Sequence, residues 1–360
     1  QRGIIMKSLK KISVFLSALT IAACLSFVNT NNNSIPFINS ISVSAETTSY
    51  GLEYQFNYNH TEVSVAGYTG TSSTLTIPSV IVEDGVSYPV TYINHYAFEN
   101  NTTLKRVYIS ENMRAVGYAS FRNSNITYIS IPSSVTNIQG NAFYNCSKLA
   151  EVSFASNSKL SKMDTGCFYN CSSLASIAIP DNVDYIYGNS FLGCTNLRTV
   201  SFNYLSSKLT AVSDACFKDC YNLENITLPK SIKDISIGAF QNCASLKSIT
   251  IPENVGRVYN NSFNGCTSLE SITFAGSSTQ DLIVYKTAFQ NLPALKTVTI
   301  NKYKSLTFEE NTFASCNNLS TVNFPLSSSG SIDIAGISFG TGSFAGTPVY
   351  NLMKFIFPNI

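Results

Sequence analysis

Charged residues are scarce in this chain: Lys, Arg, Asp and Glu make up 12% of its 360 residues, against about 25% in average proteins. The formal net charge is +2, and Lys7, Lys10 and Lys11 form the only basic cluster. A nucleic-acid-binding protein needs a basic patch to contact phosphates. The composition therefore argues against a nucleic-acid partner and leaves Ser, Thr and Asn to supply the polar surface.

Histidine is also scarce, since only His60 and His95 occur. Neither belongs to a nucleophile or metal-binding motif. Glu309-Glu310 is the nearest approach to a paired carboxylate, and such a pair is typical of a solvated face. No Cys-x-x-Cys pair with zinc-type spacing occurs either. We therefore expect no catalytic residue, no metal site and no cofactor, and predict that the protein is not an enzyme.

What the sequence does contain is a repeat. An Ala, Ser, Cys or Thr followed by Phe recurs at intervals of 22 to 26 residues, with a last interval of 31. Self-similarity at this period is typical of a solenoid, in which each unit buries its apolar face by stacking on its neighbours. The recurring phenylalanines are Phe98, Phe121, Phe143, Phe168, Phe191, Phe217, Phe240, Phe263, Phe289, Phe313 and Phe344.

The unit from Ile235 to Pro252 shows the pattern within one repeat. Its run Leu-x-x-Ile-x-Ile-Pro, ending at Pro252, alternates with period two and predicts one short strand per repeat. Proline then ends the strand because it has no N–H to donate. The Asn-Cys-x-x-Leu segment after Phe240 favours a helical turn, and the segment before Phe240 is expected to form the other wall.

These residues resemble the BspA-like class of bacterial leucine-rich repeats. Leu174–Pro180, Leu223–Pro229 and Leu246–Pro252 match its Leu-x-x-Ile-x-Ile-Pro strand motif without a gap. Three copies depart from it, with Phe154-Ala, Phe202-Asn and Phe274-Ala in place of Ile-Pro and residues inserted after them. The resemblance implies a leucine-rich-repeat solenoid of the α/β repeat class, β-rich with short helical turns, with about ten to eleven repeats. It also implies adhesion to host or neighbouring-cell surface proteins or glycoproteins.

Residues 1–45 comprise five residues upstream of Met6 and a segment that predicts a secretory signal. The basic cluster precedes an apolar run from Ile12 to Val28, and Val43-Ser-Ala45 is a small-residue cleavage site. Two alternatives remain: Ile21-Ala-Ala-Cys24 would place a lipid on Cys24, or the apolar run would stay as an uncleaved anchor. All three readings predict a secreted or cell-surface protein that meets a membrane only through such an anchor.

Residues 46–92 predict a linker and an N-terminal cap. Alternation at Leu52, Tyr54 and Phe56, a polar turn, and alternation at Val63 and Val65 indicate a β-hairpin, which would cover the first layer of the core. Residues 93–360 are then expected to form the solenoid. We expect the protein to be a monomer. Leu352–Pro358 predicts a further strand, so the array is expected to be truncated at its C-terminal end.

Cysteines recur at repeat positions instead of forming a disulfide framework. We expect nine buried, reduced thiols, because free Cys is commonly a small buried hydrophobe. Metal or redox chemistry at Cys167/Cys171 and Cys216/Cys220 is the alternative. Seven lie three residues after the repeat Phe, and two directly precede it: Cys146, Cys171, Cys194, Cys220, Cys243, Cys266 and Cys316, then Cys167 and Cys216.

Two sets of residues are candidates for a binding surface. The outward strand positions, such as Ser201, Thr250 and Thr299, are small, polar and uncharged, which is also what a soluble strand needs. Tyrosines offer a flat apolar ring with a polar tip, suited to protein or sugar contacts, although partly buried packing would explain them too. The candidate tyrosines are Tyr187, Tyr259, Tyr285, Tyr144 and Tyr169.

The sequence thus predicts a surface protein that binds without catalysis. Two alternatives belong to other classes. One is a carbohydrate-binding accessory region of a larger exported enzyme, and the other is a structural spacer for an unseen domain.

Overall fold

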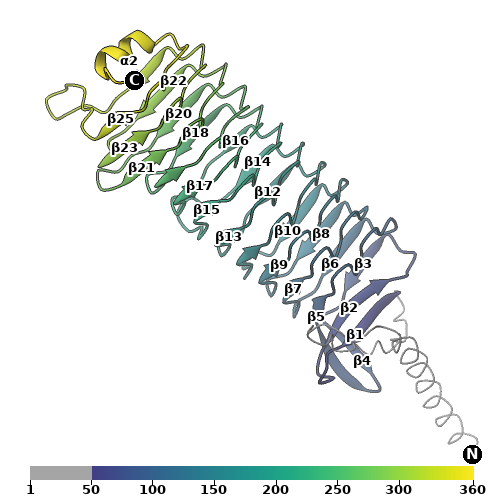
Figure 1. Cartoon of the computed structure of the whole chain (residues 1–360). Helices are drawn as coiled ribbons and strands as arrows, with labels where there is room; N and C mark the ends of the chain where they lie inside the picture. The colour runs from purple at the N-terminus through teal and green to yellow at the C-terminus, as the bar shows by residue number, and fades with distance from the viewer. Residues whose placement is uncertain (1–50) are drawn as a thin grey trace, which may run out of the picture. The chain divides into compact units, whose positions relative to one another are not determined.

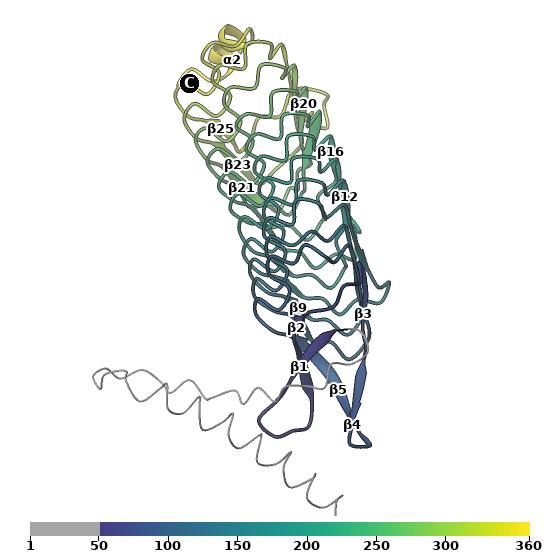
Figure 2. The ribbon, with the colours of Figure 1, turned by 90° about the vertical axis from the view of Figure 1, so that its right-hand side faces the viewer.

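The computed structural model describes residues 51–360, which form a β-solenoid of about eleven turns (Figure 1). Parallel strands line two opposite sides of it, longer strands on one side and shorter strands on the other (Figure 2). The pairing is interrupted within each set, and we call the two sets the long-strand sheet and the short-strand sheet. The leucine-rich-repeat fold is confirmed. The signal and lipidation predictions, including Cys24 and Ala45, lie outside the described residues.

The long-strand sheet contains the predicted Leu-x-x-Ile-x-Ile strands. Equivalent buried residues pair across consecutive turns, as Ile249 does with Ile272 and Ile272 with Val298. Its strands are β3 (Thr74–Ile77), β6 (Arg106–Ile109), β8 (Tyr128–Ile131), β10 (Glu151–Phe154), β12 (Ser176–Ala178), β14 (Thr199–Ser201), β16 (Asn225–Ile226), β18 (Ser248–Ile251), β20 (Ser271–Phe274), β22 (Thr297–Ile300) and β24 (Thr321–Asn323).

The prediction of one strand per repeat is wrong, because the segment before each Phe also forms a strand, and these strands make up the short-strand sheet. Most of its strands have two residues, too few for an alternating pattern, and neighbouring turns stabilise them. They are β7 (Ala115–Val116), β9 (Asn137–Ile138), β11 (Lys162–Met163), β13 (Tyr185–Ile186), β15 (Ala211–Val212), β17 (Asp234–Ile235), β19 (Arg257–Val258), β21 (Asp281–Val284), β23 (Ser305–Phe308) and β25 (Ile337–Phe339).

The predicted N-terminal hairpin is present. Strands β1 (Leu52–Phe56) and β2 (Val63–Tyr68) pair antiparallel, and β2 joins the short-strand sheet through β5 (Val86–Ile93). A second hairpin between β4 (Val80–Glu83) and β5 was not predicted. Leu52, Val63 and Val65 are buried, so the first hairpin covers the first layer of the core.

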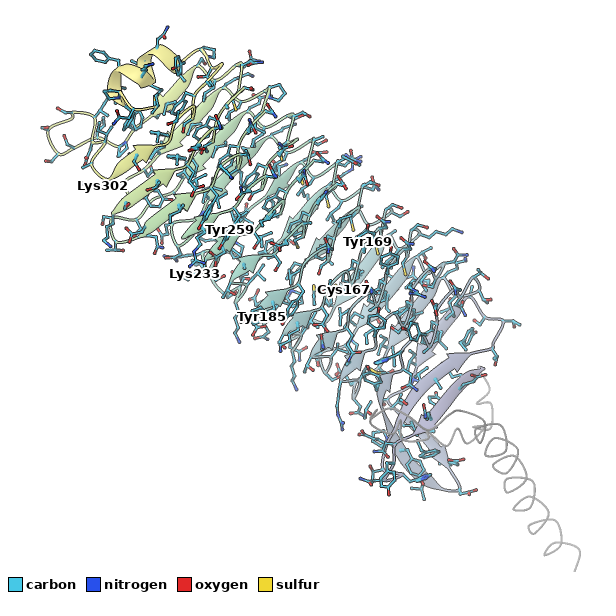
Figure 3. The ribbon with its side chains drawn as sticks, in the orientation of Figure 1. Cys167, Tyr169, Tyr185, Lys233, Tyr259 and Lys302 are labelled. Carbon is cyan, nitrogen blue, oxygen red and sulfur yellow. The ribbon has the colours of Figure 1, made fainter. Side chains whose placement is uncertain are left out.

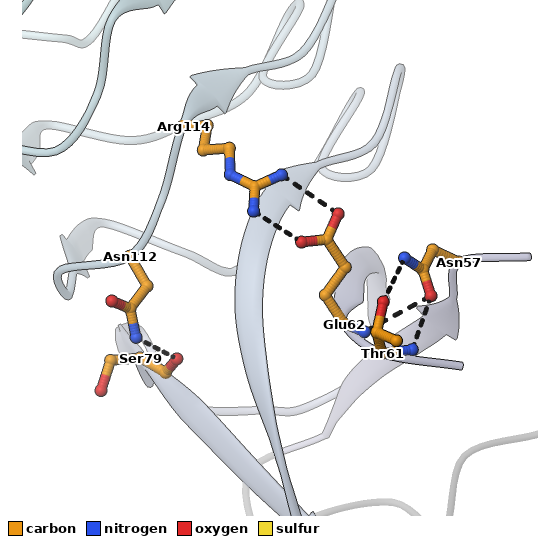
Figure 4. Close-up of polar contacts among 6 residues, drawn as sticks. All are labelled: Asn57, Thr61, Glu62, Ser79, Asn112 and Arg114. Atoms are coloured by element: carbon orange, nitrogen blue, oxygen red, sulfur yellow. Dashed lines mark hydrogen bonds and ion pairs between the residues drawn. The ribbon is translucent and has the colours of Figure 1, made fainter. Parts of the chain in front are cut away.

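Polar contacts fix this cap to the array (Figure 4). Arg114 donates two hydrogen bonds to the Glu62 carboxylate, at 3.2 and 2.8 Å. The Asn57 side chain accepts from the backbone N–H groups of Thr61 and Glu62 and so orders the hairpin turn. Asn112 donates to the Ser79 carbonyl at 3.1 Å.

The repeat phenylalanines form one continuous stack inside the solenoid. All eleven are buried, and consecutive rings lie 4.7 to 5.7 Å apart between centroids. Their planes are nearly parallel, within 22° at Phe313 and Phe344 and within 4° at Phe168 and Phe191. The last interval, 31 residues long, therefore keeps the register.

The segments after each Phe form single turns instead of helices. Cys243 N–H donates to the Phe240 carbonyl and Leu246 N–H to the Cys243 carbonyl, both at 3.1 Å. Asn242, which lies between Phe240 and Cys243, has a φ of 63°. A left-handed residue cannot continue a right-handed helix. The segment therefore makes helix-like hydrogen bonds but does not continue into a helix.

At the C-terminal end the prediction of a strand over Leu352–Pro358 is wrong, because Tyr350–Ile356 form helix α2. A strand would bury alternate side chains, whereas only Met353 of this helix is buried and Phe355 is 86% exposed. Phe357 then packs edge-on against Phe339. Within residues 51–360, no helix is long and apolar enough to cross a membrane.

Candidate functional site

The cysteines lie in the interior, as predicted: all nine cysteines within residues 51–360 are buried free thiols. Seven of them donate a hydrogen bond to the carbonyl of a Phe in the preceding repeat. The Cys243 thiol contacts the Phe217 oxygen at 3.2 Å, and the Cys146 thiol contacts the Phe121 oxygen at 2.9 Å. Burial raises the pKa of Cys146 to about 12 and that of Cys194 to about 12. A protonated thiol is a poor nucleophile, so these groups are structural.

The histidines and carboxylates are dispersed. His60 stacks on Phe56 in the cap hairpin, and His95 contacts the Tyr92 hydroxyl at 3.1 Å. Neither ring hydrogen-bonds to a serine, a cysteine or a carboxylate within residues 51–360. Glu309 accepts from the Lys286 backbone N–H at 3.2 Å. The described part of the chain contains no group of three His, Cys, Asp or Glu residues that could hold a metal ion.

Two of the candidate tyrosines form a stacked pair directly after the strands β19 and β21 of the short-strand sheet. The rings of Tyr259 and Tyr285 lie 4.9 Å apart with a 3° angle between their planes. Arg257 donates to the Tyr259 hydroxyl at 3.2 Å and lies 3.8 Å from the Asp234 carboxylate. Both rings are half-buried, so a large part of their surface packs between neighbouring turns.

The other three candidates lie elsewhere, as Figure 3 shows for Tyr169. Tyr187 is 41% exposed and stacks on Tyr185, three turns from Tyr259, or about 14 Å at the usual strand spacing. Tyr144 and Tyr169 stack on each other at 4.7 Å in the turns after Phe. The structure therefore places the five candidates in two pairs, with Tyr187 apart from both and stacked on Tyr185, and does not gather them into one site.

A larger aromatic cluster, which the sequence analysis missed, lies on the first two turns. We call Tyr92, His95, Tyr96 and Tyr118 the N-terminal aromatic patch. The His95 ring centroid lies 6.1 Å from those of Tyr92 and Tyr118, and Tyr96 packs edge-on against Tyr118 at 5.7 Å. His95, Tyr96 and Tyr118 are exposed and Tyr92 is half-buried.

Hydrogen bonds hold the patch in one arrangement. The Gln139 side-chain oxygen accepts from the Tyr92 hydroxyl at 2.7 Å and from the Tyr118 backbone N–H at 2.9 Å. Asn141 donates to the Tyr118 hydroxyl at 3.1 Å. Burial raises the pKa of Tyr92, and its hydrogen bond to Gln139 opposes that shift. Arg122 lies 5.6 Å over the Tyr96 ring.

Tyr96 has an unusual backbone conformation for a large residue, with a φ of 62°. The left-handed region costs a non-glycine residue roughly 1–2 kcal/mol, and Asn tolerates it best. Tyr96 is the only aromatic residue at this repeat position, two before the Phe. The other residues there, all but one of them small or Asn, are Ala119, Asn141, Gly166, Asn189, Ala215, Gly238, Asn261, Thr287, Asn311 and Gly342.

The sequence did contain a signal for this patch. Aligning the repeats on their Phe shows tyrosine at a position where asparagine and glycine prevail. The candidate tyrosines were predicted because they recur between repeats, whereas Tyr96 departs from the repeat.

Comparison with known proteins agrees with this architecture. The family described as "BspA type Leucine rich repeat region" matches residues 73–198, 161–282, 198–320 and 235–349. No protein with a curated description matches the sequence.

Two solved structures are similar. One is a leucine rich cell surface protein from Faecalibacterium prausnitzii A2-165, 25% identical, with a TM-score of 0.52, covering 77% of this chain and 76% of that one. The other is a leucine-rich repeat protein from Bacteroides ovatus ATCC 8483, 22% identical, with a TM-score of 0.49, covering 84% of this chain and 92% of that one.

Proposed function

Because the chain belongs to the BspA-type leucine-rich-repeat family, we propose that it is a secreted or cell-surface protein that binds macromolecules without catalysis. Its partners would be surface proteins or glycoproteins of a host or of neighbouring cells, bound by a monomer. The predicted secretory signal in residues 1–45 and the cell-surface description of the Faecalibacterium protein support this location.

The N-terminal aromatic patch is the observation that carries the proposal. Tyrosine and arginine dominate the energetically important residues of protein interfaces. Here Tyr96, at 47% exposure, and Tyr118 present ring surface beside Arg122, whose charge is paired with Glu99. Because the hydrogen bonds to Gln139 already order the patch, little side-chain entropy would be lost on binding.

The left-handed conformation of Tyr96 also supports a binding role for the N-terminal aromatic patch. Strained residues cluster at functional sites, because elsewhere a better-suited residue would serve. Asn occupies the same position in four other turns. A tyrosine there costs stability, and its ring is only about half buried, at 47% exposure.

A pair of variants tests the proposal. Tyr96→Asn replaces the ring with the residue best suited to that backbone, so it should keep or raise the melting temperature while weakening binding at least tenfold. Tyr118→Ala should weaken binding to a similar extent. Binding would be measured by surface plasmon resonance against purified extracellular-matrix proteins, mucin and bacterial surface proteins.

Tyr187→Ala is the matched control, because Tyr187 is similarly exposed but lies outside the patch. Equal affinity of wild type and Tyr96→Asn for every partner would contradict the proposal. A wild type that binds nothing in the panel would favour the spacer. Hydrolysis of an offered polysaccharide or protein would contradict the absence of catalysis.

A further inference from the structure

A second surface, on the long-strand sheet, has different chemistry from the aromatic patch. A pocket of about 270 Å³ opens there between β16 and β18. Its lining includes Tyr204, Asn225, Thr227, Ser248, Thr250 and Pro252. Within residues 51–360, β16 pairs with β14 and β18 pairs with β20, and the ladder is interrupted between β16 and β18. The hollow lies at this interruption.

Tyr204 stands beside the pocket because of an insertion. The repeat containing β14 has Phe202-Asn203 instead of Ile-Pro, and its loop is longer than in the shortest repeats. The Asn203 side chain accepts from the backbone N–H groups of Leu205 and Ser206, at 3.2 and 3.3 Å, which is a side-chain-capped turn.

Both neighbouring turns anchor this loop. Asp181 of the preceding turn accepts a short hydrogen bond from the Ser206 hydroxyl. On the other side, Lys230 N–H of the following turn donates to the Tyr204 carbonyl at 3.0 Å. The loop backbone at Tyr204 is therefore held in place before any ligand arrives, and the Tyr204 side chain is 44% exposed.

The pocket lining combines polar side chains with the apolar residues Ile226, Leu228 and Pro252, and it carries no charge. The side chains of Asn225, Thr227, Ser248 and Thr250 make no hydrogen bond to other parts of residues 51–360, so their donors and acceptors are available. Two ion pairs lie at its border, Lys230 with Glu253 at 2.7 Å and Arg198 with Glu224 at 3.0 Å. No charged side chain lines the pocket itself, so a charged ligand would find no counter-charge in the lining.

A ligand that fits this lining has several hydroxyl groups, one flat apolar face and no charge. A pyranose ring has all three properties: its hydroxyls would bond to the amide and hydroxyls of the lining, and its C–H face would pack on the Tyr204 ring. We propose that this pocket binds a sugar unit of a neutral oligosaccharide or polysaccharide. The proposal goes beyond the proposed function, since its residues lie on another sheet from the aromatic patch.

The probes are neutral oligosaccharides: cello-, malto-, manno- and galacto-oligosaccharides and N-acetylglucosamine oligomers. Binding to the purified protein would be measured by saturation-transfer NMR and isothermal titration calorimetry. At least one of these sugars should bind, with an affinity unchanged between low and high salt because the ligand is neutral. Tyr204→Ala should lower that affinity about tenfold, whereas Tyr204→Phe, which keeps the ring, should change it little.

Two more variants separate binding from folding. Thr250→Val keeps the shape of a pocket residue and removes its hydroxyl, so it should lower the affinity without changing the melting temperature. Tyr185→Ala removes a similarly exposed tyrosine from the short-strand sheet and should have no effect.

If none of the sugars binds the wild type, or if Tyr204→Ala binds as well as wild type, the proposal is wrong. An affinity that falls steeply with salt would also overturn it. Neither result bears on Tyr96→Asn, so the two proposals can fail independently.

Discussion

Raising the pH should destabilise this protein through its cysteines. A buried thiol resists ionisation, and its pKa in the folded chain exceeds the value of 9.0 for an exposed thiol: it is about 12 at Cys146 and Cys194 and about 11 at Cys316. The unfolded chain therefore loses protons first as the pH rises. The contribution of the buried thiols to the free energy of unfolding is therefore fully present below pH 9 and declines above it. It is lost once the pH passes the pKa values of the thiols in the folded chain.

The size of the effect follows from those values. Between pH 8 and pH 10 each of the three thiols removes roughly 1 to 2 kcal/mol from the free energy of unfolding. Together they remove about 4 kcal/mol, which is a large fraction of a typical stability. The pKa values of Cys167, Cys171, Cys216, Cys220 and Cys243 are also raised by burial, so the full loss is larger.

The measurement is a urea titration at pH 8 and at pH 10, in the presence of a reductant and followed by circular dichroism. The control is the triple variant Cys146→Ser, Cys194→Ser and Cys316→Ser. A hydroxyl suits this position, because Ser124 occupies it, buried, in an earlier turn. The variant should lose about 4 kcal/mol less than wild type between the two pH values. Equal losses in the two proteins would refute the assignment to the thiols.

Three further predictions concern the core. An alkylating reagent at pH 7.5 should label the nine thiols of residues 51–360 slowly in the native protein and rapidly in urea; fast native labelling, or a mass deficit from disulfides, would contradict their burial. Phe240→Ala should lower the free energy of unfolding by roughly 3–5 kcal/mol in a urea titration, since it opens a gap in the ring stack; a neutral effect would mean that the stack does not stabilise the array. Gly193→Ala should lower the melting temperature, because Gly193 has a φ of 74° and an added Cβ would lie 2.0 Å from the Asn170 side-chain oxygen; an unchanged melting temperature would show that the Asn170 side chain moves aside freely.

The candidate binding residues were only partly accessible to sequence reasoning. Tyr259 and Tyr285 recur at one repeat position, and residues at one position of a solenoid stack on their equivalents, so their contact could be foreseen. Whether the stacked rings face solvent depends on the side chains beside them. Tyr96 and Tyr204 were not predicted, because each of them departs from the repeat.

The repeat period by itself determined the solenoid, the stacked phenylalanines and the buried cysteines, because a residue at a fixed position in every turn meets its own equivalents. The tertiary structure decided the rest. The two-residue strands such as Asp234–Ile235 exist only through pairing with the next turn, and α2 forms where an alternating pattern favoured a strand. The aromatic patch and the Tyr204 pocket depend on distances between neighbouring turns, which the order of residues along one turn does not specify.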